Sequence, residues 1–220
     1  MNWLIIVAGG SGQRMGNKIN KVFLKIKGKP IVYWTIKKAQ ECKMIDKIIV
    51  SVAKKDFQKI NNLGFDKIID LVTPSDSRQA STAKILERLK AEDTDLIGVH
   101  NAANPLVTIE EIEKVYEAAE KFGAALLAMP VTDTIKIADE NNFVTETPIR
   151  KNCWAAQTPQ VARFDLMKKA FAKAKEDNFV GTDDSQLLGK IGIKAKIVEC
   201  SVNNFKITYL EDLQKAKKII

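Results

Sequence analysis

Short apolar runs rich in valine, isoleucine and leucine recur along the chain, separated by longer segments whose apolar positions have helical spacing. Runs of this length are typical of buried strands, and their alternation with helical segments is typical of α/β proteins. The sequence therefore predicts a mostly parallel sheet flanked by helices. We expect its strands at residues 3–7, 47–52, 67–71, 96–99, 124–129 and 196–200.

Capping residues mark where several of the helices begin. Pro30 pre-sets the first turn of one helix. Thr108 and Glu111 have the spacing of a capping box, which predicts another. A further helix is expected after Ser77, and residues 211–219 are predicted to form the last one.

Residues 132–151 break the alternation, because they are polar and Asn141, Asn142 and Pro148 mark turns between short β-like runs. We interpret them as a β-arm that leaves a single domain spanning residues 1–220, since no linker or internal repeat divides the chain. Such an arm serves dimerisation or is a surface hairpin, and the pattern alone does not separate these alternatives.

The charge of the chain indicates the kind of ligand it attracts. Its 220 residues carry a net charge of +8, and thirty of its thirty-five basic residues are lysines scattered along the sequence. Scattered lysines with 7% aromatic residues are not typical of a nucleic-acid-binding module, which interleaves basic and aromatic residues. The positive field would still attract polyanions such as nucleoside triphosphates.

Cysteine and histidine usage excludes several kinds of chemistry. Cys42, Cys153 and Cys200 are odd in number and widely spaced, which indicates neither a disulfide framework nor a zinc site. His100 is the one histidine, so Ser-His-Asp catalysis and histidine-rich metal sites are disfavoured. No signal peptide or membrane-spanning run is recognisable, and we expect a cytoplasmic protein.

The loop after the first strand carries the clearest chemical signal. Glycines there allow the backbone to approach a phosphate closely and to direct N–H groups at it. The end of a strand also places the loop at the ligand-binding edge of a parallel sheet. The loop residues expected to cradle a nucleotide are Ala8, Gly9, Gly10, Ser11 and Gly12.

Three kinds of glycine-rich loop compete for this segment. A dinucleotide fingerprint requires a further glycine that is displaced by one position here, and an acidic residue at the end of the second strand, where Ser51 stands. A P-loop requires Gly-Lys-Ser/Thr after its spacer, which is absent. A nucleotidyltransferase loop remains. Arg14 and Lys21 then become candidates to bind phosphate oxygens, on which charge develops during transfer.

The sequence resembles the methylerythritol phosphate cytidylyltransferases and their relatives, the ribitol phosphate cytidylyltransferases. Matching blocks follow one another in the same order and spacing across essentially the whole chain. They lie at residues 8–16, 21–30, 76–81, 99–105, 130–136, 150, 156–160, 182–184 and 203–208.

The resemblance implies a Rossmann-like three-layer nucleotidyltransferase fold with a protruding β-arm and a Mg²⁺-dependent reaction. CMP would pass from CTP to a polyol phosphate with release of pyrophosphate. The resemblance also implies a homodimer whose arm reaches into the partner's site, and no nucleic-acid or membrane partner.

The same resemblance implies roles for individual residues. The triphosphate would be surrounded by Arg14, Lys21 and Lys206, and the acceptor phosphate would be bound by Thr134 and Arg150. Cytosine and ribose would be recognised by the backbone at Ala8 and Gly9, and by Asp76 and Ser81, and Arg78 is a further candidate for substrate binding.

Two positions depart from the family pattern His-Asp-Ala-Ala-Arg-Pro, since Asn101 and Asn104 replace its acidic and basic residues. Asn101 keeps an oxygen that can bind substrate or coordinate a metal, but without charge. Compensation between the two changes, an altered acceptor and a catalytically impaired nucleotide-binding homologue remain alternatives. Asn20 also replaces the usual proline before Lys21, which raises the prospect that Lys21 is aimed differently.

The remaining motifs bear on the acceptor and on two acidic residues. The sequences around Thr134 and residues 154–160 favour 2-C-methyl-D-erythritol 4-phosphate, whereas Gly9 in place of alanine favours ribitol 5-phosphate. Asp183 and Asp184 are interpreted as acids in the first turn of a helix, with metal binding as the alternative. His100, which no acidic residue follows, is expected to be structural.

Overall fold

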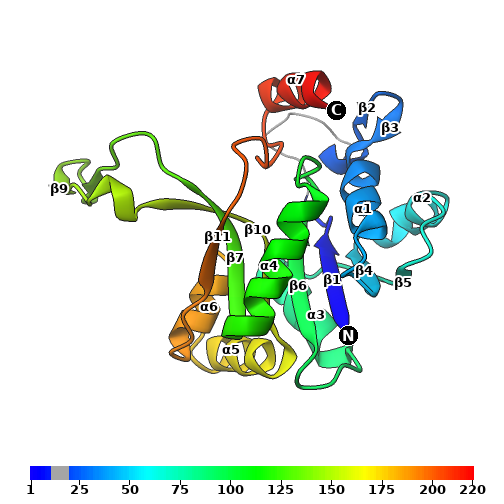
Figure 1. Ribbon diagram of the computed structural model, residues 1–220, viewed down its shortest axis with the longest axis horizontal. Coiled ribbons are helices and arrows are strands. Elements are labelled where there is room, and N and C mark those ends of the chain that lie inside the picture. The colour runs from blue at the N-terminus through cyan, green and yellow to red at the C-terminus, as the bar shows by residue number, and fades with distance from the viewer. Residues whose placement is uncertain (11–19) are drawn as a thin grey trace.

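In residues 1–10 and 20–220, which the computed structural model describes, a seven-stranded sheet forms the centre of the protein (Figure 1). The strands in sheet order are β11 (Lys196–Glu199), β7 (Ala124–Pro130), β10 (Trp154–Arg163), β6 (Leu96–Asn101), β1 (Asn2–Val7), β4 (Lys47–Ser51) and β5 (Ile68–Val72). All six predicted strands are present, with bounds that differ by one or two residues.

Strand β10 was not predicted, and it makes the sheet mixed. It pairs antiparallel with both β6 and β7, whereas the other neighbours in the sheet pair parallel. Its register against β7 shifts between Ala156 and Gln160, around Pro159. The glutamines and the proline in this segment disfavoured a strand in the sequence analysis, although residues 158–162 are buried.

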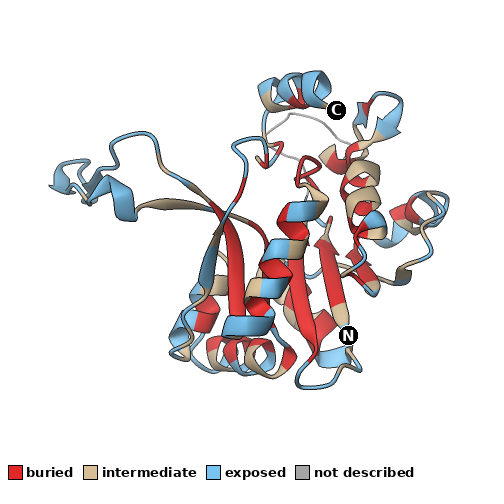
Figure 2. Ribbon diagram, in the orientation of Figure 1, coloured by how far each residue is buried: buried red, intermediate tan, exposed pale blue. Residues whose placement is uncertain are grey.

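Helices cover both faces of the sheet and give the predicted three-layer α/β architecture. Side chains of α1 (Ile31–Glu41) and α4 (Ile109–Phe122) pack with Leu4 and Ile6 of β1. Those of α3 (Arg78–Arg88), α5 (Phe164–Glu176) and α6 (Asp184–Lys190) pack with Trp3 and Ile5 on the other face. Alternate side chains of β1 thus belong to two cores, and the strands are buried between the helices (Figure 2).

The predicted capping residues stand where the helices begin. Pro30 precedes α1, and Ser77 caps α3 by accepting a hydrogen bond from the Ala80 N–H. Thr108 and Glu111 form the capping box of α4. Smaller elements are η2 (Lys21–Phe23), β2 (Lys25–Ile26), β3 (Lys29–Pro30), η3 (Lys54–Asp56), α2 (Phe57–Asn61) and the C-terminal α7 (Leu210–Ile219).

The predicted arm leaves the sheet between β7 and β10 and extends away from the body (Figure 1). Its tip is a hairpin of β8 (Ile137–Ala138) and β9 (Val144–Glu146), and η4 (Arg150–Asn152) follows on the way back. Nearly all of residues 132–151 are exposed. Apolar side chains are among them, namely Ile135, Ile137, Phe143, Val144 and Ile149. In the part of the chain that is described, no helix has the length and apolar character needed to cross a membrane.

Candidate active site

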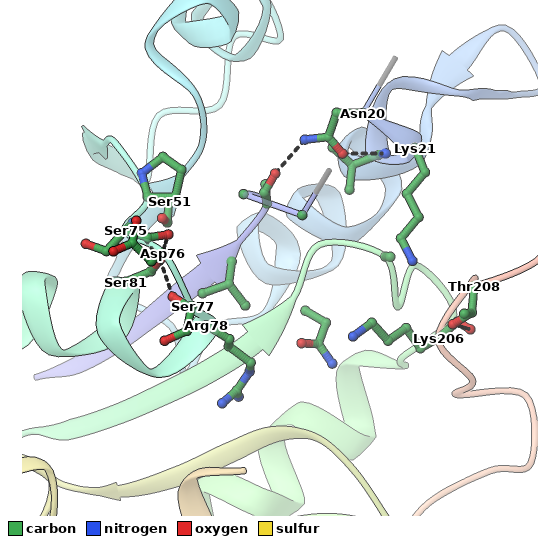
Figure 3. A pocket seen from close by; sticks show the side chains of 18 residues that line it. Asn20, Lys21, Ser51, Ser75, Asp76, Ser77, Arg78, Ser81, Lys206 and Thr208 are labelled. Atoms are coloured by element: carbon green, nitrogen blue, oxygen red, sulfur yellow. Dashed lines mark hydrogen bonds between the residues drawn. The ribbon is translucent and has the colours of Figure 1, made fainter. Parts of the chain in front are cut away.

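A cavity of about 480 Å³ opens at the carboxyl ends of β1, β4 and β6 (Figure 3). The three strands are parallel, so the segments that follow them meet at one edge of the sheet, where α/β proteins bind ligands. The cavity is lined by residues 7–10, 20–22 and 74–78, together with Ser51, Ser81, Asn101, Ala103, Lys206 and Thr208.

The glycine-rich loop enters this cavity through a close backbone approach. Ala8 is buried, and its N–H donates to the Ser51 carbonyl at 2.7 Å. A Cβ placed on Gly9 would lie 2.6 Å from the Cβ of Pro74, which real side chains do not tolerate, whereas one on Gly10 would meet open space. The close approach of Pro74, which lies in a distant segment of the chain, therefore accounts for glycine at position 9.

Two lysines enter one end of the cavity from segments far apart in the sequence. Lys21 begins η2, and Lys206 lies in the segment after β11 beside Thr208 (Figure 3). Asn20 holds this end together: its side-chain amide donates to the Ala8 carbonyl at 2.7 Å and its Oδ1 accepts from the Val22 N–H at 3.3 Å. The replacement of proline by Asn20 therefore leaves Lys21 directed at the cavity.

The opposite end of the cavity carries hydroxyl groups and the carboxylate of Asp76 (Figure 3). Ser81 of α3 shapes this end, because its Oγ donates to the Ser77 carbonyl at 2.7 Å and accepts from the Ser75 N–H at 2.9 Å. Ser77 in turn caps α3. Ser81 thus fixes the loop that presents Asp76 to the cavity.

Arg78 lines the cavity, but its guanidinium is bound by Asp184 of α6. The two nitrogens donate to the two carboxylate oxygens at 2.9 and 2.5 Å, and Asp184 is buried. Burial by itself disfavours the charged guanidinium, but the carboxylate outweighs this effect and raises the pKa of Arg78. Asp183 caps α6 by accepting from the Gln186 N–H. The two acids therefore have structural partners, in agreement with their structural interpretation.

His100 is buried at the end of β6 and links the strand to its neighbours. Its Nε2 lies 3.2 Å from the Asn104 carbonyl, which only accepts, so Nε2 carries the proton and Nδ1 accepts from the Thr158 hydroxyl at 2.8 Å. The Thr158 Oγ1 also accepts from the Asn101 N–H. Burial lowers the pKa of His100 from 6.5 to about 4, so the ring is neutral at physiological pH. This arrangement supports the expected structural role and shows a part played by Thr158 that the sequence did not reveal.

The two asparagines that depart from the family pattern occupy different environments. Asn101 lines the cavity. Asn104 is fully buried outside its lining, and its Nδ2 donates to Gln157 Oε1 and to the Asn204 carbonyl. Within the described part of the chain, the Oδ1 atoms of Asn104 and Asn204 have no hydrogen-bond partner. The two substitutions therefore do not face each other across the substrate cavity.

Most of the predicted site residues meet in this cavity. They are Ala8, Gly9, Gly10, Lys21, Asp76, Arg78, Ser81, Asn101 and Lys206. Thr134 and Arg150 do not line it; they are exposed on the arm, where Arg150 donates to the Thr132 carbonyl at 3.2 Å. Ser11, Gly12 and Arg14 were predicted as well and lie outside the described residues.

The three-layer fold and a cavity with lysines at the edge of a parallel sheet define an α/β nucleotidyltransferase. A family model described as 2-C-methyl-D-erythritol 4-phosphate cytidylyltransferase matches residues 3–220. The chain belongs to this family, as the sequence motifs had indicated.

Individual relatives agree with this assignment along their full lengths. The 2-C-methyl-D-erythritol 4-phosphate cytidylyltransferase of Caldanaerobacter subterraneus subsp. tengcongensis is 40% identical over 218 residues, which cover 97% of this chain and 96% of that protein. The crystal structure of 4-diphosphocytidyl-2C-methyl-D-erythritol synthase from Anaerococcus prevotii superposes with a TM-score of 0.88 at 30% identity, covering 99% and 95% of the two chains. The Francisella tularensis cytidylyltransferase gives 0.84 at 32% identity, with 100% and 99% covered.

Proposed function

We propose that this protein transfers CMP from CTP to the phosphate of 2-C-methyl-D-erythritol 4-phosphate and releases pyrophosphate. The observation that carries the proposal is the division of the cavity into an end with two lysines and an end with hydroxyls and Asp76. A nucleoside triphosphate has two matching parts, since its phosphates require cations, whereas its base and ribose are bound by hydrogen-bonding groups such as hydroxyls and a carboxylate that accepts from ribose hydroxyls.

The acceptor itself supplies the nucleophile for this reaction. A phosphate monoester has a second pKa of about 6, so it is largely dianionic near neutral pH and needs no general base. The protein's one histidine is buried and neutral outside the cavity lining, which is compatible with such chemistry. A phosphate oxygen of the acceptor attacks the α-phosphorus of CTP in line, the bond to the bridging oxygen breaks, and pyrophosphate leaves with both electrons.

The cationic residues stabilise the negative charge that builds up during this transfer. Lys21 and Lys206 approach the same end of the cavity, where they would hold the triphosphate and the leaving pyrophosphate. Arg14 would join them, as its place in the motif implies. Because Lys21 belongs to η2 and Lys206 to the segment after β11, these two lysines would be in position before the substrate arrives.

The family uses a divalent metal ion with CTP, for which we propose Mg²⁺ or another divalent cation, and the donor groups of the cavity suit a cation held mainly by its substrate. Among the described residues there is no cluster of three acidic, histidine or cysteine side chains. Mg²⁺ commonly takes few protein ligands and several phosphate oxygens. Asn101 offers an uncharged oxygen ligand at the end of β6, and the triphosphate would provide the remaining negative ligands. When bound, the ion would neutralise phosphate charge.

The base and ribose would occupy the other end of the cavity. Ser81, Asp76 and the backbone of residues 8–10 would recognise them, and Ser11 and Gly12 would complete the loop. Arg78 would act chiefly through its ion pair with Asp184, which connects the start of α3 to α6. This connection would keep the loop of residues 74–77 in place against the nucleotide.

The arm supports a homodimer of single-domain protomers. Its exposed apolar side chains would lose contact with water in a dimer, and Thr134 and Arg150, which are exposed on the arm, do not line their own protomer's cavity. We therefore propose that residues 132–151 of one protomer reach the partner's cavity and that Thr134 and Arg150 bind the acceptor phosphate there.

Pyrophosphate release from CTP and Mg²⁺ tests the function, with 2-C-methyl-D-erythritol 4-phosphate and ribitol 5-phosphate offered separately. We expect release with the first acceptor and little with the second. Release with ribitol 5-phosphate alone would contradict the proposed acceptor. CTP binding without release with either acceptor would also contradict the proposal and would indicate an altered acceptor or a catalytically impaired homologue.

A further inference from the structure

The hydroxyl group of Ser51 stands out in the cavity because nothing in the described protein satisfies it. Ser51 is the last residue of β4, and 1% of its surface is exposed. It lines the cavity, yet among the described residues its Oγ has no hydrogen-bond partner. A buried polar group without a partner is costly, and in a cavity it is a sign that the ligand supplies the partner.

The backbone holds this hydroxyl in place. Ser51 pairs with Val7 of β1 on one side and with Val72 of β5 on the other. Its carbonyl accepts from the Ala8 N–H at 2.7 Å. The backbone of Ser51 is therefore fixed between two strands beside the cavity, and its buried Oγ can change direction only by rotation of the side chain.

The position of Ser51 shows which part of a nucleotide it would meet. Ser51 lies beside Ser75, Asp76 and Ser81, across the cavity from Lys21 and Lys206 (Figure 3). The lysine end would take the phosphates, so the base would be the part that reaches Ser51. The Ser81 hydroxyl already donates to the Ser77 carbonyl and accepts from the Ser75 N–H, whereas that of Ser51 neither donates nor accepts among residues 1–10 and 20–220.

We propose that the Ser51 hydroxyl hydrogen bonds to the edge of the nucleotide base and thereby contributes to CTP binding. The inference rests on the proposed function, because it takes the occupant of the cavity to be CTP. A base edge carries amino, carbonyl and ring-nitrogen groups, and a hydroxyl that can both donate and accept suits any of them. In dinucleotide-binding proteins the end of the second strand carries an acid for the ribose, whereas the neutral Ser51 at this position suits an uncharged base.

Calorimetric titration of Ser51→Ala with CTP and, separately, with pyrophosphate tests the proposal, in the presence of Mg²⁺ and without acceptor. We expect the Kd for CTP to rise about three- to tenfold, as for one lost hydrogen bond, and the Kd for pyrophosphate to stay unchanged. Ser185→Ala is the matched control, because that hydroxyl has a protein partner, Asp183, and lies outside the cavity. Its CTP affinity should equal that of the unmodified protein.

Thermal unfolding of the free Ser51→Ala protein provides a second measurement. Removing an unpaired hydroxyl should leave the melting temperature unchanged or slightly higher. An unchanged Kd for CTP, an equal weakening of CTP and pyrophosphate, or a clear loss of thermal stability would each overturn the proposal. Because binding is measured without turnover, absence of pyrophosphate release from the unmodified protein would contradict the proposed function and leave this test intact.

Discussion

The guanidinium of Arg78 and the carboxylate of Asp184 form a two-point ion pair across 106 residues of sequence. The pair joins the first residue of α3 to the first residue of α6. Asp184 is buried and the Arg78 side chain is 26% exposed, so most of the ion pair is shielded from water.

Asp184→Asn should therefore destabilise the protein strongly. The substitution leaves a largely desolvated guanidinium without its counter-charge, and we expect a loss of about 3 kcal/mol in the free energy of unfolding. Urea denaturation measures this loss. Arg163→Gln at the exposed Arg163–Asp165 pair is the control and should leave stability close to that of the unmodified protein. Equal effects of the two substitutions would contradict a special role for the buried pair.

Gly9→Ala should be destabilising, because its Cβ would lie 2.6 Å from that of Pro74. Forcing such an overlap costs about 1–3 kcal/mol, measurable by thermal unfolding of the free protein. Gly10→Ala is the control, since its Cβ meets open space. In a Pro74→Gly background, which is itself less stable because the unfolded chain gains freedom, Gly9→Ala should cost much less than in the unmodified protein, and an equal cost would place the cause elsewhere.

Lys21→Ala and Lys206→Ala should each lower kcat by about 10²–10³-fold while the fold stays intact. Both remove positive charge from the end of the cavity assigned to the triphosphate. The measurements are steady-state pyrophosphate release and circular dichroism. Lys218→Ala on the exposed face of α7 is the control, because it removes one positive charge away from the cavity, and it should leave kcat nearly unchanged. A kcat near that of the unmodified protein in both cavity variants would contradict a role for these lysines in the reaction.

Arg150→Ala should raise the KM for the polyol phosphate much more than the Kd for CTP. Arg150 is exposed on the arm and is assigned to the acceptor in the partner's cavity. Lys151→Ala, which alters the adjacent charge in η4, is the control and should have little effect. Sedimentation of both variants checks that the dimer persists. A selective loss of CTP binding in Arg150→Ala would contradict this assignment and would indicate that Arg150 binds the nucleotide.

His100 should make stability depend on pH in the mildly acidic range. Burial, together with a smaller effect of the Arg78 charge, lowers its pKa from 6.5 to about 4, so the unfolded chain binds a proton that the folded protein does not. The contribution is complete above pH 6.5 and is lost as the pH falls toward 4, by about 3 kcal/mol in total. Urea denaturation at several pH values should give a shallower profile for His100→Asn than for the unmodified protein. Parallel profiles would contradict the lowered pKa.

The sequence by itself determined the layered fold and the place of the nucleotide loop. Buried strands and amphipathic helices differ in the period of their apolar residues, and caps such as Thr108 with Glu111 act within one turn of chain. Both signals are local, so they can be recognised without the partner segments. The glycine-rich motif after β1 can be recognised in the same way, although the need for glycine at position 9 comes from Pro74 in a distant segment.

Tertiary structure decided the features that depend on distant segments. Strand β10 becomes a strand because β6 and β7 flank it, although Pro159 and its glutamines argue against one. Only the fold separates Asn101 at the cavity from the buried Asn104, pairs Arg78 with Asp184, and leaves the Ser51 hydroxyl unpaired within the described protein. Hydrogen bonds and desolvation depend on which groups meet in space. Contacts between residues that are a hundred positions apart produce no periodic pattern in the sequence, so the sequence alone does not predict them.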